Sequence, residues 1–462
     1  MTVRSSLTDG RQRGQLPMGR VVTTWWPLAL SWLLMAVEVP MISAVVARLD
    51  NPDVHLAAFG GIVYPLALIV GAPVIMLLAA STALSKDWDS YRKLMRVTML
   101  MGAFLTGIHA LVAFTPLYDV VIVRLMDPPA EIIEPARIGL MVTVLWNWAV
   151  GYRRFKQGVL IRFGHSRAVG IGSFVRLGTE GIVLAVGYSV GSIPGILVAS
   201  SALTVGVICE AGYTAVRARP VIQGQLRDAP PVEEPLTLRS FTVFYIPLAM
   251  TAILGLLAEP LKSVALTRMP RALDSLAVWS VVNGLVFIFR SVGMAYSEVV
   301  IALLDEPRSL WTLRRFTTIL SVVVTVLLVV VSVTPLALFW FQNLTGLRAE
   351  LALFSHGGLW YALIMPGVFV LQSWYQGLIV HSRRTRGVSE AVLTYILTSG
   401  ALLLFGVLWD RVPGLYVGMA ALSLGRLTQT IWLWYRSRPA VDAVEERDRA
   451  VGPCQGADVV AL

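Results

Sequence analysis

The chain is poor in charge and in cysteine. Only 14% of its 462 residues are Asp, Glu, Lys or Arg, whereas a soluble domain carries roughly 25%. This low value excludes a protein whose surface is mostly in contact with water. The two cysteines, Cys209 and Cys454, stand in no spacing that predicts a disulfide framework or a metal site.

Signatures of nucleotide-dependent and metal-dependent enzymes are also absent. The sequence contains no G-x-x-x-x-G-K-[ST] phosphate-binding loop and no H-E-x-x-H metal-binding helix. The net charge of +10 comes from basic residues dispersed over short polar segments, which is typical of membrane proteins and needs no nucleic-acid partner. We therefore expect a protein that is not an enzyme, with no catalytic residue, metal, cofactor or nucleic acid.

Apolar residues are what the chain has in abundance. They make up 56% of the sequence and recur as runs of about twenty residues, the length that crosses a hydrocarbon core of roughly 30 Å. Because every backbone polar group in lipid must be satisfied within its own segment, these runs predict helices. The expected fold is an all-α integral membrane protein of about twelve spans, whose partners include membrane lipids. The predicted spans are 22–46, 57–83, 95–117, 136–158, 168–190, 193–216, 241–267, 275–303, 316–341, 351–380, 388–409 and 412–435.

The basic residues between the spans predict the orientation. With the N-terminus inside, 27 of the 38 Lys and Arg residues fall in inside segments and seven in outside segments. The positive-inside rule then predicts a multi-pass protein of the cytoplasmic (inner) membrane with both termini in the cytoplasm.

An internal repeat divides the chain into two similar halves. Pro27-Leu28-Ala29-Leu30 returns as Pro247-Leu248-Ala249-Met250, and Gln157-Gly158 returns as Gln376-Gly377, at a nearly constant spacing. Each half contains six spans, an even number, so the repeats are expected to run parallel, with a substrate site between them. The predicted parts are a cytoplasmic N-terminal segment 1–21, a six-helix bundle 22–219, a cytoplasmic linker 220–239, a second six-helix bundle 240–438 and a disordered cytoplasmic tail 439–462.

Two local patterns resemble a known superfamily. The run Trp25-Trp26-Pro27-Leu28-Ala29-Leu30, followed by Pro40 and Arg48, resembles the progressive ankylosis protein family of the multidrug/oligosaccharidyl-lipid/polysaccharide (MOP) flippase superfamily. The basic segment from Gln157 to Arg167, echoed from Gln376 to Arg386, is similar to that superfamily's short loop before its fifth and eleventh helices. The resemblance implies a V-shaped pair of bundles, and either export of an organic anion or flipping of a lipid-linked saccharide.

Acidic residues inside the spans are candidates for coupling or gating. Glu38 lies in the middle of the first span beside Pro40, and Glu259 occupies nearly the corresponding place in the seventh. Glu38 fits two roles: a carboxylate in a cavity that binds a proton or cation, or a structural hydrogen bond to a neighbouring helix. Glu259 has Lys262 one turn further on, so a local neutralising pair competes with a functional role.

Basic residues inside the spans are candidates for holding a substrate. Arg290 and Arg426 have no acidic residue at helical spacing on their own helices, and a guanidinium stays charged. With Lys262 they give the second bundle three intramembrane basic residues, against Arg176 alone in the first. This asymmetry favours an anionic substrate group held by the second half, although pairing with Glu259 or Glu298 is an alternative.

The remaining intramembrane charges have simpler interpretations. Arg176 and Glu180 are four residues apart and can pair on one helix face. Glu210 and Glu298 are expected near cytoplasmic helix ends, where a long side chain can extend to water.

The sequence therefore predicts a secondary active exporter of an organic or phosphate-bearing anion, working by alternating access. Arg290, Arg426 and Lys262 would bind the anion, while Glu38 and Glu259 would serve coupling to a proton or cation, or gating. Two alternatives remain open at this stage. One is a flippase for a lipid-linked saccharide, and the other is a membrane-embedded scaffold or enzyme without transport.

Overall fold

The computed structural model of the chain describes residues 16–450, apart from residues 125, 127 and 346. Some side chains within helices are also outside the description, and that of Glu259 is one of them. Throughout the described part the chain folds into helices joined by turns, with no strand, which confirms the predicted all-α fold.

The described part of the first half is a series of α-helices with three short π-helical segments. They are α2 (Met18–Val46), α3 (Pro52–Ala58), η1 (Phe59–Val63), α4 (Tyr64–Ile75), α5 (Leu77–Leu84), α6 (Trp88–Phe114), η2 (Asp119–Arg124), α7 (Ala130–Val142), α8 (Trp146–Arg162), α9 (Ser166–Val190), α10 (Gly195–Val221) and η3 (Ile222–Leu226).

The second half repeats this order. Its elements are α11 (Leu238–Leu266), α12 (Ala272–Met294), α13 (Tyr296–Leu303), α14 (Ser309–Val333), α15 (Leu336–Phe339), η4 (Trp340–Leu344), α16 (Ala349–Leu359), η5 (Trp360–Ala362), α17 (Met365–His381), α18 (Arg386–Trp409) and α19 (Gly414–Ala450).

Ten helical segments of the described chain are long and apolar enough to cross a membrane. Two further predicted spans, 136–158 and 412–435, correspond to the broken helix α7–α8 and to α19. With these two, the described chain has six long helical segments on each side of the linker, close to the predicted number. The α7–α8 segment is less apolar than the other ten because α8 carries basic residues in its interior.

The sequence repeat is also a repeat of helix boundaries. Leu77, the first residue of α5, and Tyr296, the first residue of α13, have the same spacing in the chain as Gln157 and Gln376. We call this spacing the repeat offset. It also relates the ends of α6 and α14, the starts and ends of α8 and α17, the ends of α9 and α18, and the starts of α10 and α19. The two halves therefore break and end their helices at equivalent places.

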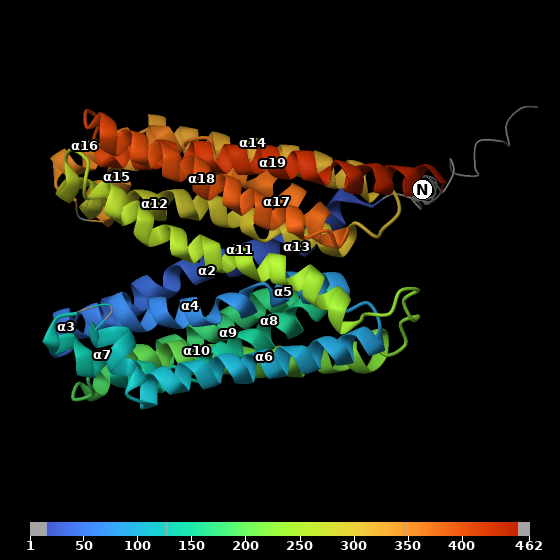
Figure 1. Cartoon of the computed structure of the whole chain (residues 1–462), viewed down its shortest axis with the longest axis horizontal. Helices are drawn as coiled ribbons and strands as arrows, with labels where there is room; N and C mark the ends of the chain where they lie inside the picture. The colour runs from blue at the N-terminus through green and yellow to red at the C-terminus, as the bar shows by residue number, and fades with distance from the viewer. Residues whose placement is uncertain (1–15, 125, 127, 346, 451–462) are drawn as a thin grey trace, which may run out of the picture. The chain divides into compact units, whose positions relative to one another are not determined.

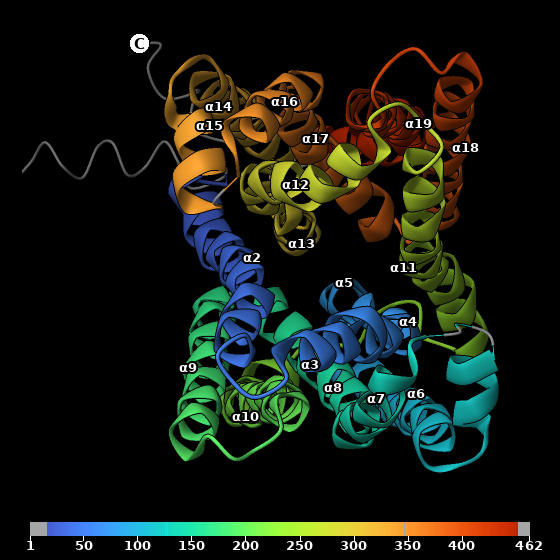
Figure 2. The same cartoon turned by 90° about the vertical axis from the view of Figure 1, so that its left-hand side faces the viewer.

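The chain forms two compact units, and the boundaries between them fall within α2 and within α11. One unit comprises Leu30–Leu256, and the other comprises Met1–Ala29 with Leu257–Leu462. In the first, α8 packs against α4, α5, α6, α9 and α10; in the second, α17 packs against α12, α13, α14, α18 and α19. Figure 1 shows α6, α8, α9 and α10 running along one another, and Figure 2 shows them end-on. The helices α8 and α17, equivalent in the repeat, are thus the central helices of their units.

The C-terminal helix continues further than the sequence indicates. The composition of 439–462 predicts disorder, but α19 is helical to Ala450; residues 451–462 lie outside the described residues. Ala440 and Val444 are buried on one face of this extension. One turn later, Arg447 donates a hydrogen bond of 2.9 Å to the carbonyl oxygen of Leu304. Because these three side chains recur at helical spacing, the extension has a packed face that its overall composition conceals.

The predicted orientation can be tested at exposed positions of the connections. In a background with Cys209 and Cys454 replaced by Ser, a cysteine introduced at Asp50 or Asn343 is expected to react with an impermeant thiol reagent on intact cells. A cysteine at Arg167 or Asp228 is expected to react only after lysis, because the basic connections belong inside. All four native side chains are exposed. Reaction at Arg167 without lysis would contradict the predicted topology.

Candidate functional site

The central helix of the first unit carries a run of buried polar side chains. Arg153, Arg154, Lys156 and Gln157 lie in the interior of α8 and are all at least nine-tenths buried. The predicted span 136–158 includes these positions, but their charges were counted with those of the inside connection because charges normally interrupt an apolar span. The correction has a physical reason: α8 is covered by neighbouring helices on all sides, so its polar groups meet protein and not lipid.

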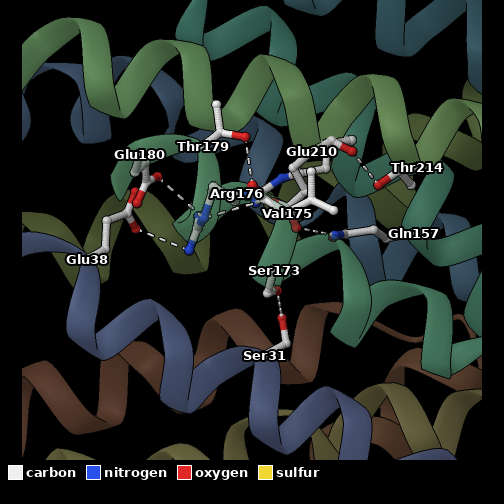
Figure 3. A network of polar contacts seen from close by, with 11 residues as sticks. Ser31, Glu38, Gln157, Ser173, Val175, Arg176, Thr179, Glu180, Glu210 and Thr214 are labelled. Carbon is white, nitrogen blue, oxygen red and sulfur yellow. Dashed lines mark hydrogen bonds and ion pairs between the residues drawn. The ribbon is translucent and has the colours of Figure 1, made fainter. Parts of the chain in front are cut away.

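Arg176 on α9 is the centre of a buried charge network (Figure 3). Its Nη2 atom lies 3.2 Å from Oε2 of Glu38 on α2. Its Nε atom lies 3.6 Å from Oε2 of Glu210 on α10 and 3.7 Å from Oε1 of Glu180 on α9 itself. The predicted pairing of Arg176 with Glu180 is thus one of three contacts that Arg176 makes with carboxylates. The helices α2, α9 and α10 bring these four charged groups together.

Glu210 is the most firmly held carboxylate of this network. It forms an ion pair with Arg153 and accepts a hydrogen bond of 3.0 Å from Nε2 of Gln157. Its side chain is fully buried, so the prediction that it extends to water is wrong. The cause is again α8, because its buried side chains Arg153 and Gln157 supply the hydrogen-bond donors that Glu210 was expected to obtain from water.

Glu38 is likewise held by a partner. Its ion pair with Arg176 joins α2 to α9. About two turns away along α2, the hydroxyl oxygens of Ser31 and Ser173 join the same two helices through a contact of 2.5 Å. The hydrogen bond to a neighbouring helix expected as one role of Glu38 therefore takes the form of an ion pair. One carboxylate oxygen of Glu38, Oε1, nevertheless accepts no hydrogen bond from the described residues.

Glu180 is the least satisfied carboxylate. Both of its carboxylate oxygens are buried and accept no hydrogen bond from the described residues, and its ion pair with Arg176 is the longest of the set. Gly206 on α10 leaves the space that the side chain occupies, because a Cβ atom there would lie 2.4 Å from Cγ of Glu180. Figure 3 shows the carboxyl groups of Glu38 and Glu180 side by side, both facing Arg176.

Further groups of the first unit lie around this network. The guanidinium of Arg154 lies over the ring of Trp32, 5.4 Å from its centre. Tyr64 on α4 is within electrostatic reach of Glu38, Arg176 and Glu180. The network therefore combines three carboxylates with two directly paired guanidiniums, beside a third guanidinium and a phenol.

In the second unit the structure brings together two of the predicted substrate-binding residues. Arg290 on α12 and Arg426 on α19 both lie over the ring of Phe369 on α17, at 5.4 and 5.7 Å from its centre. Arg290 also lies 5.3 Å from the ring centre of Phe287, and Arg426 lies 4.2 Å from that of Tyr395. Both guanidiniums are thus positioned by aromatic rings.

Arg426 has no acidic partner among the described residues. The one hydrogen bond of its guanidinium to a described residue is donated by Nη1 to the side-chain oxygen of Gln429, at 2.9 Å, and the side chain of Arg426 is half-buried. Lys262, the third predicted residue, is buried with its Nζ atom 6.0 Å from the ring centre of Trp279. It therefore lies at a different ring from the one that Arg290 and Arg426 share. The side chain of Glu259 lies outside the described residues.

One premise of the sequence analysis does not hold. Arg176 was taken as the only intramembrane basic residue of the first half, but Arg153, Arg154 and Lys156 are buried there as well. The excess of basic residues in the second half therefore disappears. What distinguishes the second unit is the absence of a described carboxylate beside Arg426, not the number of its basic residues.

Several residues of these sites were not found from sequence. Gln157 was noticed only as a mark of the repeat, although it donates to Glu210. Phe369 carries no sequence signal, because an aromatic residue in an apolar span is ordinary packing. The burial of Arg153 could have been suspected from its repeat equivalent, Gln372, which lies inside a predicted span.

Comparison with solved structures identifies the fold. The chain is similar to an outward-facing multidrug resistance MATE family transporter of the MOP superfamily, with 14% identity, 93% of this chain and 97% of that chain covered, and a TM-score of 0.70. It is similar to a MATE in a straight conformation, with 16% identity, coverage of 94% and 98%, and a TM-score of 0.72. A third similar structure is a MOP superfamily transporter from Pyrococcus furiosus, with 14% identity, coverage of 94% and 97%, and a TM-score of 0.68.

These similarities show that the chain has the fold of MOP superfamily transporters. No protein-family model matches the chain, and no curated protein matches it in sequence. A nearness to the progressive ankylosis family in particular remains a prediction.

Proposed function

We propose that this chain, which has the fold of MATE transporters, is a secondary active exporter of an organic or phosphate-bearing anion. In this proposal it lies in the cytoplasmic membrane with both termini inside and works by alternating access. The observation that carries the proposal is the pair of guanidiniums over Phe369, because Arg426 stays charged and faces no described carboxylate.

The stacking of these guanidiniums suits them to an anion. An aromatic ring attracts the flat face of a guanidinium and leaves its in-plane N–H groups to bind elsewhere. Those N–H groups form a planar fork that matches a carboxylate or a phosphate. Phe369, which contacts both Arg290 and Arg426, therefore supports two forks at one place.

The binding pocket of one similar structure is described by its polarity. For the MOP superfamily transporter from Pyrococcus furiosus, a reverse polarity of the binding pocket is described as suggesting a different function. That description concerns the other protein.

The network around Arg176 supports a role in coupling. A guanidinium already stands among its three carboxylates, so a metal cation entering there would meet a fixed positive charge. A proton fits better, because Glu38 and Glu180 hold buried oxygens that lack a hydrogen-bond donor and one proton between them would supply it. We assign Glu38 and Glu180 to this step, with Arg176 as the group that positions both.

Flux into sealed vesicles containing only this protein tests the proposal. We expect a proton gradient to drive uptake of candidate carboxylate and phosphate-ester anions. Glu38→Gln is expected to reduce that uptake about tenfold or more and to remove its pH dependence, because the loss of a positioned proton-transfer group usually has an effect of at least this size. Glu131→Gln, an exposed change at the start of α7, is the control and should leave flux unchanged.

Three outcomes would oppose the proposal. If Glu38→Gln transported like the parent across pH, Glu38 would have a structural role only. If no anion moved while a lipid-linked saccharide crossed the bilayer, the chain would be a flippase, and the same basic residues would serve its diphosphate. If neither moved, the chain would be a scaffold or an enzyme without transport.

A further inference from the structure

A pocket lies at the start of α6, outside both sites described above. It has a volume of about 290 Å³ and is formed where the linker and the first turn of α11 meet α6. Figure 1 shows α11 starting at the end of this unit where α6 also starts. Its lining residues are Lys93, Leu94, Arg96, Val97, Leu236, Thr237, Leu238 and Phe241.

The floor of the pocket is apolar and fixed. Leu94, Leu236 and Phe241 are each more than nine-tenths buried. Lys93 holds the linker in place, because its Nζ atom donates a hydrogen bond of 2.9 Å to the carbonyl oxygen of Leu236 and pairs with Asp89 at 2.6 Å. The pocket is therefore built by contacts within the unit and does not depend on a loose loop.

The rim of the pocket is basic, and its arginine side chains can bind a ligand. Arg96 is exposed and forms no hydrogen bond or ion pair with a described residue. Arg92, one helical turn earlier, is exposed in the same way. The acidic groups of the surroundings are Asp89, which is occupied by Lys93, and Glu233 and Glu234 of the linker.

The residues around the pocket have the pattern expected where a span meets the lipid headgroups. Trp88, at the first position of α6, is partly exposed and stacks on Tyr91, and tryptophan is enriched at the membrane–water interface. Beyond Arg96 the exposed side of α6 becomes apolar, with Leu100 72% and Phe104 67% exposed. Arg96 and Phe104 are eight residues apart, a rise of about 12 Å, which fits within one leaflet of roughly 15 Å.

We propose that this pocket binds a membrane phospholipid with an anionic headgroup. Arg96, assisted by Arg92, holds the headgroup phosphate. The upper part of an acyl chain enters beside Leu94 and Val97 and continues along Leu100 and Phe104. The charge of the rim and the apolar strip leading away from it match the two parts of such a lipid, whereas a soluble anion would use only the rim.

The second unit provides an internal contrast. A pocket at the start of α14, of about 410 Å³, includes Arg308, Arg314 and Arg449 but also the two carboxylates Glu445 and Asp448 of the α19 extension. These carboxylates repel an anion, so we assign no lipid to that pocket. Arg315 on α14 is the repeat equivalent of Arg96, is exposed and lies over the ring of Trp311. It therefore supplies a matched control position.

Native mass spectrometry of the full chain, titrated in detergent with lipids of identical acyl chains, tests the proposal. We expect the parent and Arg315→Gln to retain phosphatidylglycerol in preference to phosphatidylcholine. Arg96→Gln is expected to weaken retention about fivefold, the equivalent of about 1 kcal/mol per basic residue near an anionic surface. Val97→Trp, which fills the pocket, is expected to weaken retention of both lipids because it excludes the acyl chain while leaving the rim intact.

Three outcomes would overturn the proposal. One is equal retention of phosphatidylcholine by the parent. The second is unchanged retention of phosphatidylglycerol by Arg96→Gln, a surface variant that is not expected to misfold. The third is displacement of phosphatidylglycerol by soluble glycerol 1-phosphate, because it would show that the rim alone binds the anion and that the pocket contributes nothing.

Discussion

Arg176→Gln is expected to lower the free energy of unfolding by about 3–5 kcal/mol, the loss typical when one partner of a buried ion pair is removed. The guanidinium contacts Glu38, Glu180 and Glu210, and all four side chains are almost fully buried. Without it, Glu38 and Glu180 lose their described ion-pair partner. Unfolding of the purified protein measured by heat or denaturant would show the loss.

A second-site change separates this effect from simple loss of packing. Adding Glu180→Gln to Arg176→Gln removes one of the stranded charges and should restore part of the lost stability. Arg167→Gln, at an exposed position in the first turn of the same helix, is the control and should unfold like the parent. Equal stability of Arg176→Gln and the parent would mean that the network does not hold α2, α9 and α10 together.

Arg426→Gln is expected to weaken binding of the transported anion about 10- to 100-fold while changing stability little. Hydrogen bonds to charged groups contribute about 1.5–3 kcal/mol, which corresponds to that range. Stability should hold because Arg426 is half-buried and has no described acidic partner to strand. Anion binding measured by calorimetry, together with thermal unfolding of the same sample, gives both quantities.

The conservative change at this position tests the geometry of the site. Arg426→Lys keeps the charge but loses the planar fork and the stacking on Tyr395 and Phe369. We expect it to bind the anion more weakly than the parent and more tightly than Arg426→Gln. A variant that lost stability with unchanged anion affinity would place Arg426 in the scaffold and not in the substrate site.

The sequence predicted the helices well because the signal for a membrane span is local. Length and apolarity of each run are enough to predict a span, and the repeat offset predicts where equivalent helices break. The exception, α8, shows the limit. Arg153 and Lys156 look like loop residues until the neighbouring helices that cover them are known, and that information is tertiary.

The candidate sites were predictable only in part for the same reason. Glu38 and Arg176 stand out because charge is rare in apolar spans, yet their ion pair joins α2 to α9, two helices that are far apart in the chain. The approach of Arg290 and Arg426 to Phe369 depends on three helices packing together. Residue type can mark such positions, but only packing shows which of them meet.

The repeat gives the buried network a further meaning. Each of its positions on α8, α9 and α10 has a neutral equivalent at the repeat offset: Gln372 for Arg153, Tyr395 for Arg176, Ser399 for Glu180 and Gln429 for Glu210. The same backbone shape therefore carries four charged side chains at these positions in one half and four neutral ones in the other, where Tyr395 and Gln429 contact Arg426 instead. Converting a single position leaves one buried charge uncompensated, at a cost of several kcal/mol, so the two interiors are connected by no stable one-step intermediate. A chimera that exchanges these four positions between the halves therefore has to exchange them together, and has to neutralise Glu38 as well, because its ion-pair partner is Arg176.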